Sequence, residues 1–182
     1  PQPMSSSVSI DRAVKLRWTQ YNLDAMFRAF WADSTSLAYL PLNDTEARAN
    51  TPLPFCIYEA MQGFRQSRST GSTCEPHKSI EYWTFPIQFS IHATQKNGRS
   101  GKDIAYELLG RPNTGDLHND GHGILKAFHD SAGPLEMEGE DRHIQTHIDG
   151  DIARREEDTE WVVTLMLNIE IERRQRIRGL GA

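Results

Sequence analysis

The sequence predicts an α+β fold: a mainly antiparallel sheet of about four strands flanked by helices, with a long polar arm between the first two strands. Large or apolar side chains occupy every odd position from Trp83 to Ala93, and the same alternation recurs from Trp161 to Ile171. Because successive side chains of a strand point to opposite faces, each segment is typical of a long strand with one buried face. Phe89 and Leu167, in the middle of these faces, are predicted core residues.

The first predicted element is a helix for which Ser9 is the N-cap. Its apolar positions recur at helical spacing: Ile10, Val14, Trp18 and Tyr21. We expect Asn22 to Asp24 to interrupt this helix before a second helical segment from Ala25 to Trp31. The aromatic side chains of that segment need a sheet or another helix to cover them.

A short strand from Phe55 to Met61 follows Pro52 and Pro54, which bound an irregular segment. The chain from Gln62 to Ser79 is then polar and rich in glycine and serine, and it predicts a long loop or a hairpin arm. Long insertions between strands are usually functional or disordered, so this arm is a candidate contact with a partner. Its basic side chains are the candidate contact residues: Arg65, Arg68 and Lys78.

Three further elements are predicted after the Trp83 strand. A turn at Asn97-Gly98 leads into a helix from Ser100 to Leu109, which Gly110 ends. Another helical turn or two is expected around Ile124 and Phe128. A third long strand from about Arg142 to Ala153 carries one alternating set: Ile144, Thr146, Ile148, Gly150 and Ile152.

Length and composition indicate one domain. The chain has 182 residues and a formal net charge of −5, which argues against a general or sequence-specific nucleic-acid binder. Residues 1–8 and 173–182 are expected to be flexible tails. Neither a signal peptide nor a membrane span is expected, which predicts a cytosolic protein. Cys56 and Cys74 have no metal-binding spacing and are predicted to be free thiols.

Chemistry-bearing motifs are few in this sequence. It contains no phosphate-binding glycine loop, no nucleophile elbow and no paired Cys-x-x-Cys, so we expect no catalytic, cofactor-binding or metal-binding residue and no enzyme. On a strand, His143 and His147 lie about 13 Å apart and cannot chelate one ion alone. One alternative stays open, a small metal-dependent enzyme that uses the loop containing His118 and His122.

Charged clusters supply the remaining candidates for interaction. The acidic run from Glu136 to Asp141 is expected at the surface. Near the last strand, one mixed cluster predicts a hairpin tip or a subunit contact that fixes register: Arg154, Arg155, Glu156, Glu157 and Asp158. Arg173 and Arg174 open a basic C-terminal segment that suits nucleic acid or an acidic neighbour, although a solvated terminus is expected for its last residues.

The order of elements resembles the tail terminator (tail completion) proteins of long-tailed phages. The similarity rests on the helical N-terminal segment, the strand in Pro52 to Tyr58, the polar arm, the long strand Phe85 to Ala93 with the helix after it, and the closing strand Trp161 to Ile171. It implies a non-enzymatic, commonly hexameric homo-oligomeric ring of the virion neck, built in the host cytoplasm. Such a ring caps the tail tube protein and meets the head-tail connector or stopper protein. A head-tail stopper or adaptor ring is the other structural alternative.

Overall fold

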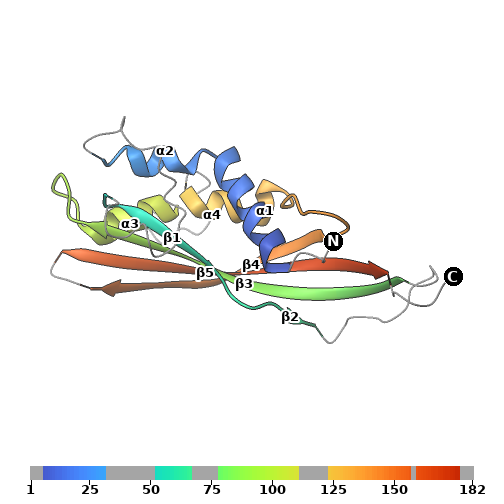
Figure 1. Cartoon of the computed structure of the whole chain (residues 1–182). Helices are drawn as coiled ribbons and strands as arrows, with labels where there is room; N and C mark the ends of the chain where they lie inside the picture. The colour runs from blue at the N-terminus through green and yellow to red at the C-terminus, as the bar shows by residue number, and fades with distance from the viewer. Residues whose placement is uncertain (1–5, 32–51, 67–77, 111–122, 157–158, 177–182) are drawn as a thin grey trace.

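The computed structural model describes residues 6–31, 52–66, 78–110, 123–156 and 159–176. Within these ranges the chain forms an open antiparallel sheet of five strands with four α-helices, which confirms the predicted α+β class. The helices gather on one face of the sheet, and no helix of the described ranges lies on the other face (Figure 1). We call the uncovered side the open face.

The sheet follows the order β1-β3-β5-β4, so its two longest strands lie at the centre. These are β3 (Lys78–Thr94) and β5 (Glu160–Arg176), paired with each other along their full length. The edges are β1 (Phe55–Ala60) and β4 (Arg142–Arg155). A short strand, β2 (Phe64–Arg65), pairs with β3 beyond the end of β1. The sheet therefore has one strand more than predicted.

Both central strands extend beyond the segments that alternation predicts. Apolar alternation ends near Trp83 and Ile171, but pairing continues as far as Lys78 and Arg176. In this extension Glu81 lies opposite Arg173, and opposite charges on facing strands stabilise the pairing. Arg173 and Arg174 therefore lie in β5, although a flexible tail was predicted from residue 173. Residues 6–8, predicted to belong to a flexible N-terminal tail, lie in a helix.

The predicted polar arm is also partly strand. Phe64 and Arg65 pair with Thr84 and Trp83, and β3 begins at Lys78. Both ends of 62–79 therefore follow the hairpin form of the prediction, because polar residues there join the sheet through backbone pairing. Residues 67–77, including Arg68, lie outside the described residues.

Strand β4 contains two irregularities that reset its side-chain alternation. One falls between His143 and Gln145 and the other between Ile148 and Gly150. The φ angle of Gly150 is 151°. An extra residue at a bulge shifts the following side chains to the opposite face. The predicted single face of β4 is therefore wrong: Thr146 is buried, while Ile152 is 59% exposed.

Helix α1 (Ser6–Gln20) begins earlier than predicted, so Ser9 lies inside it and is not its N-cap. The side chain of Ser9 is buried, and its hydroxyl has no hydrogen-bond partner among the described residues. Apolar residues at helical spacing form the buried face, as predicted for Ile10, Val14 and Trp18. Tyr21 lies after the helix and is 37% exposed, because Asn22 turns the chain with φ of 49°.

Helix α2 (Leu23–Arg28) follows this turn and buries Leu23 and Phe27. Helix α3 (Gly101–Leu109) ends at Gly110 as predicted, with φ of 99° there. Ser100, predicted as the first helical residue, is instead the N-cap: its side chain accepts a hydrogen bond from the Asp103 amide. Helix α4 (Gly123–Phe128) precedes the 3₁₀-helix η2 (Asp130–Ala132).

The segment after α4 is held by one buried arginine of α1. The Arg17 guanidinium donates to four backbone carbonyl oxygens, those of Ala127 (2.9 Å), Ala132 (3.3 Å), Gly133 (3.2 Å) and Pro134 (2.7 Å). Arg17 is 5% exposed. Since a buried charge is tolerated only when it is hydrogen-bonded, Arg17 fixes the route by which the chain enters β4.

Candidate interaction surface

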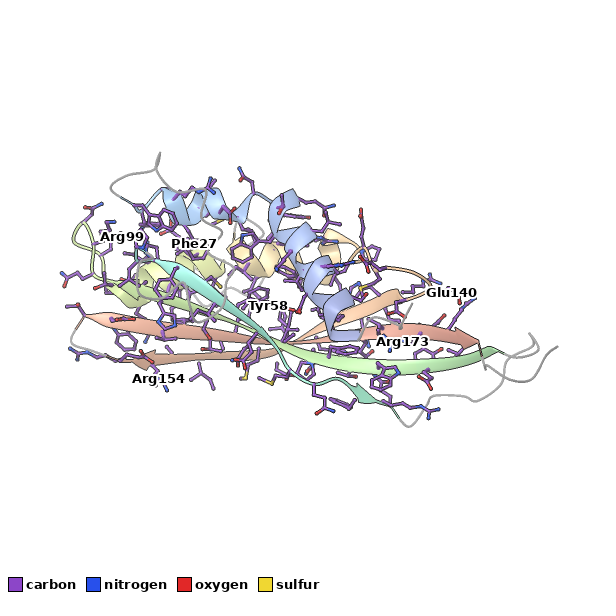
Figure 2. The ribbon with its side chains drawn as sticks, in the orientation of Figure 1. Phe27, Tyr58, Arg99, Glu140, Arg154 and Arg173 are labelled. Atoms are coloured by element: carbon purple, nitrogen blue, oxygen red, sulfur yellow. The ribbon has the colours of Figure 1, made fainter. Side chains whose placement is uncertain are left out.

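The predicted interaction residues that the structure describes fall into two groups at opposite ends of the sheet. Arg154, Arg155 and Glu156 lie at the hairpin that joins β4 to β5, whereas Arg65, Arg173 and Arg174 lie at the far end of β3 and β5. Figure 2 shows Arg154 and Arg173 separated along the sheet. Trp161 pairs with Arg155 at the hairpin, and the 12 residue steps of β5 from Trp161 to Arg173 correspond to roughly 40 Å. These side chains cannot form one site within a single chain.

At the far end, Arg65, Arg173 and Arg174 each have a partner within the chain. Arg173 donates two hydrogen bonds to Asp141, at 3.1 and 3.0 Å, and its guanidinium lies 5.7 Å from the centre of the Trp83 ring. Arg174 pairs with Glu172 at 3.0 Å. Arg65 and Glu81 are 3.8 Å apart. The Arg173 pair is largely shielded from solvent, so it fixes β5 to the turn before β4.

The acidic segment before β4 is tied to its own chain in the same way. Glu138 accepts a hydrogen bond from Arg12 at 2.6 Å, and Asp141 binds Arg173. These contacts join the segment to α1 and to β5. Asp141 and Arg173 therefore neutralise one another within the chain, and Glu138 is neutralised by Arg12.

The hairpin end carries a second internal pair, between Arg154 and Glu156. The backbone amide of Glu156 donates to the Glu160 carbonyl at 3.0 Å and closes the hairpin, as the mixed charge predicted. Glu157 and Asp158 lie outside the described residues. The side chain of Lys78 is likewise undescribed, although its backbone begins β3.

The described histidines do not form one cluster. His143 is buried: its Nδ1 accepts a hydrogen bond from the Leu135 amide at 3.1 Å, and its Nε2 lies 2.9 Å from Thr146 Oγ1. Burial lowers the pKa of His143. His147 and His129 are exposed. His118 and His122 lie outside the described residues. The structure therefore does not test the alternative of a metal-dependent enzyme that uses them.

The buried side chains of Cys56 and Tyr58 both have a raised pKa, which keeps them in their neutral forms. Burial raises the pKa of the Cys56 thiol, which disfavours the reactive thiolate. Burial first, and then the neighbouring Asp11 carboxylate, raise the pKa of Tyr58, whose hydroxyl donates to Asp11 at 2.9 Å. Both groups act as parts of the packing between β1 and α1. Cys74 lies outside the described residues.

Exposed apolar side chains on the two edges of the sheet were missed by the sequence analysis. Ile144 (40% exposed) and Ile152 (59%) belong to the β4 edge, while Met61 (41%) and Phe64 (55%) belong to the edge formed by β1 and β2. Alternation alone could not identify them, because the bulges turn the β4 pair outward and Phe64 lies in the unpredicted strand. Isolated exposed apolar residues are common, but pairs on both edges mark candidate contact surfaces.

A hollow of about 600 Å³ lies beside the β4 edge, between the first residues of that strand and the segment that Arg17 holds. Its lining is mixed in character, with Leu135 and Ile144 beside Asp130 and Arg142. No strand of the described residues pairs with the outer side of β4. At the start of β4, the edge thus combines unpaired backbone groups, the exposed side chain of Ile144 and a hollow.

Sequence comparisons assign no relationship to this chain. No family model matches it, and no curated protein matches it. Within the described ranges, no helix combines the length and apolar character that crossing a membrane requires.

Proposed function

We propose that this chain is a structural subunit of a phage neck: a ring protein that caps the tail tube and joins it to the head connector, as tail terminators do. The observation that carries the proposal is the pair of unlike sheet edges, each with exposed apolar side chains. The order of the described elements, which places two helices before β1 and a helix after the long β3, supports the same reading.

The edges favour a ring because they are different surfaces. An exposed strand edge offers unpaired backbone groups that invite another chain. The β4 edge presents Ile144 and Ile152, and the β1–β2 edge presents Met61 and Phe64. When unlike surfaces of identical subunits meet, the contact is heterologous, and repeated heterologous contacts close into a ring if the rotation allows. In the proposed ring, the β4 edge of one subunit meets the β1–β2 edge of the next.

The internal ion pairs fit this division of roles. Arg173 with Asp141 and Arg154 with Glu156 hold the ends of the sheet in shape within each subunit. The ends then remain as surfaces for other particle proteins, namely the tail tube protein at one side of the ring and the connector or stopper at the other. Apolar edges supply the contacts between subunits, where burial of apolar area stabilises association.

The oligomer is tested by one substitution on each edge. Mass photometry of the full chain should show a ring, whereas I152K or F64K alone should leave monomers because either substitution places a charge in every interface. L16K is the matched control, since Leu16 is an exposed apolar residue of α1 (41%) outside both edges. It should assemble like the unaltered chain.

Mixing the two edge variants distinguishes a ring from a symmetric dimer. In the heterologous arrangement, the intact β4 edge of F64K meets the intact β1–β2 edge of I152K, so the mixture forms heterodimers that cannot extend. A symmetric dimer through one edge leaves one variant dimeric by itself and gives no heterodimer. A full chain that stays monomeric at all concentrations would overturn the ring.

The place in the particle needs a separate experiment. Cryo-electron microscopy of particles that contain the chain should locate it between tail tube and connector, and particles lacking it should show heads and tails unjoined. Location in the capsid shell or at the distal end of the tail would refute the neck role even if the isolated chain forms rings.

A further inference from the structure

We propose that His92, Glu156 and Glu160 form a binding site for a divalent metal ion of the zinc type. Each residue offers one ligand atom, an imidazole nitrogen or a carboxylate oxygen, and these atoms all lie within 4.8 Å of one another. His92 belongs to β3, Glu160 begins β5, and Glu156 follows β4. The site would therefore tie three segments together at one end of the sheet. This proposal does not depend on the ring proposed above.

The distance between His92 and Glu160 matches the geometry that zinc requires. His92 Nδ1 lies 3.2 Å from Glu160 Oε1. In a tetrahedral site with metal–ligand bonds of about 2.0–2.2 Å, neighbouring ligand atoms are roughly 3.3 Å apart. The His92 and Glu160 atoms already have this separation. Glu156 lies on an exposed turn, so its flexible side chain can complete the triangle by a small rotation.

His92 is held in place before any ion binds. Its ring stacks on Phe55 with centroids 4.7 Å apart and planes inclined by 11°, and the residue is 5% exposed. The amide of Glu156 donates to the carbonyl of Glu160, which fixes the two glutamates across the hairpin. Ligands that are already oriented lose little conformational freedom on binding. The stack with Phe55 plays the orienting role that outer contacts play in known metal sites.

The donor set selects the kind of ion. Calcium and magnesium prefer oxygen ligands alone, whereas an imidazole nitrogen together with carboxylates suits zinc and similar transition metals. Two carboxylates also supply negative charge to balance the ion. Glu156 contacts Arg154 through one oxygen, and a carboxylate has a second oxygen for a metal.

Zinc titration of the full chain, freed of metal by chelator and dialysis, tests the proposal through calorimetry and thermal unfolding. Zinc should bind and raise the unfolding temperature, since an ion that binds only the folded state stabilises it. E156Q and E160Q, which keep side-chain shape, should each weaken binding about ten-fold or more, because even orienting contacts of metal ligands contribute that much. Cobalt(II) in place of zinc should give absorption bands that either substitution changes.

H147Q is the matched control. His147 lies 3.8 Å from Glu170, so it forms a similar pair, but it is not among the described groups of three possible ligands. It should bind zinc like the unaltered chain. No zinc binding, binding that E156Q and E160Q leave unchanged, or equal loss in H147Q would each overturn the site. Circular dichroism of each variant verifies folding, and Glu156 is exposed enough that E156Q should fold even if E160Q does not.

Discussion

The indole ring of Trp18 stacks on the phenyl ring of Phe89, with centroids 6.0 Å apart and planes inclined by 24°. Phe89 also contacts Tyr58 (5.4 Å) and Phe128 (4.9 Å) through its ring. Side chains from α1, β1 and α4 therefore meet on one residue of β3. This aromatic group connects the helical layer to the centre of the sheet.

Replacing Phe89 with alanine should lower the free energy of unfolding by about 3–5 kcal/mol, since the ring is fully buried and its loss leaves a cavity. Denaturant unfolding followed by circular dichroism measures the change. Gln88→Ala is the control, because Gln88 points to the open face and only pairs with Glu59 there. Equal losses in the two variants would contradict the anchoring role of Phe89.

Arg17→Met should cost about 3 kcal/mol or more, because it leaves carbonyl oxygens near α4 and η2 without their donor. The exposed Arg12, which pairs with Glu138, gives the comparison: Arg12→Met should cost less than about 1 kcal/mol. Hydrogen exchange should also rise in residues 127–135 of the Arg17 variant alone. Unchanged exchange there would show that the guanidinium does not hold the segment.

Acidification should destabilise the fold through His143. Because burial lowers its folded-state pKa below the ordinary 6.5, the unfolded chain binds the proton more readily, and stability present above pH 6.5 is lost as pH falls below it. Protonation of Nδ1 also removes the acceptor of the Leu135 amide. The difference in unfolding free energy between the unaltered chain and H143Q should therefore shrink from pH 7.5 to pH 5. A difference independent of pH would contradict this linkage.

Gly101→Ala should destabilise the start of α3. A Cβ atom there would lie 2.4 Å from the carbonyl oxygen of Ala93, so the helix or the end of β3 must shift. Overpacking of this kind costs about 1–3 kcal/mol. Lys102→Ala, one residue further along the same helix, should be nearly neutral. A neutral G101A by thermal unfolding would mean that the contact relaxes freely.

The sequence was sufficient where local chemistry decides structure. Alternation predicted β3 and β5 with Phe89 and Leu167 inside, and both are buried. Gly110 correctly ended α3, since a positive φ at a helix terminus depends on nearby residues. Features that depend on distant partners were not predictable, among them β2, the polar ends of the central strands and the bulges of β4.

The candidate site shows the same division. Arg173 and Asp141 each suggested a free charged patch, but only the register of β4 with β5 reveals that they neutralise one another. His92 and Glu160 are 68 positions apart, so no spacing rule connects them. The exposure of Ile152 depends on a bulge rather than on its own residue type. The candidate sites of this chain are formed by residues that lie far apart in the sequence and meet through strand pairing.

The position of β5 between β3 and β4 also constrains the order in which the chain folds. Strands β4 and β5 are neighbours in sequence and can form a hairpin early. The pairing of β3 with β5 instead joins distant residues, for example Ser90 and Thr164, 74 positions apart. Closing so long a loop costs entropy before its contacts are gained, so the central pairing should form late. Until then the apolar face and inner edge of β5 remain open to other nascent chains. The chain is therefore exposed to aggregation until β3 pairs with β5 of the hairpin and with β1.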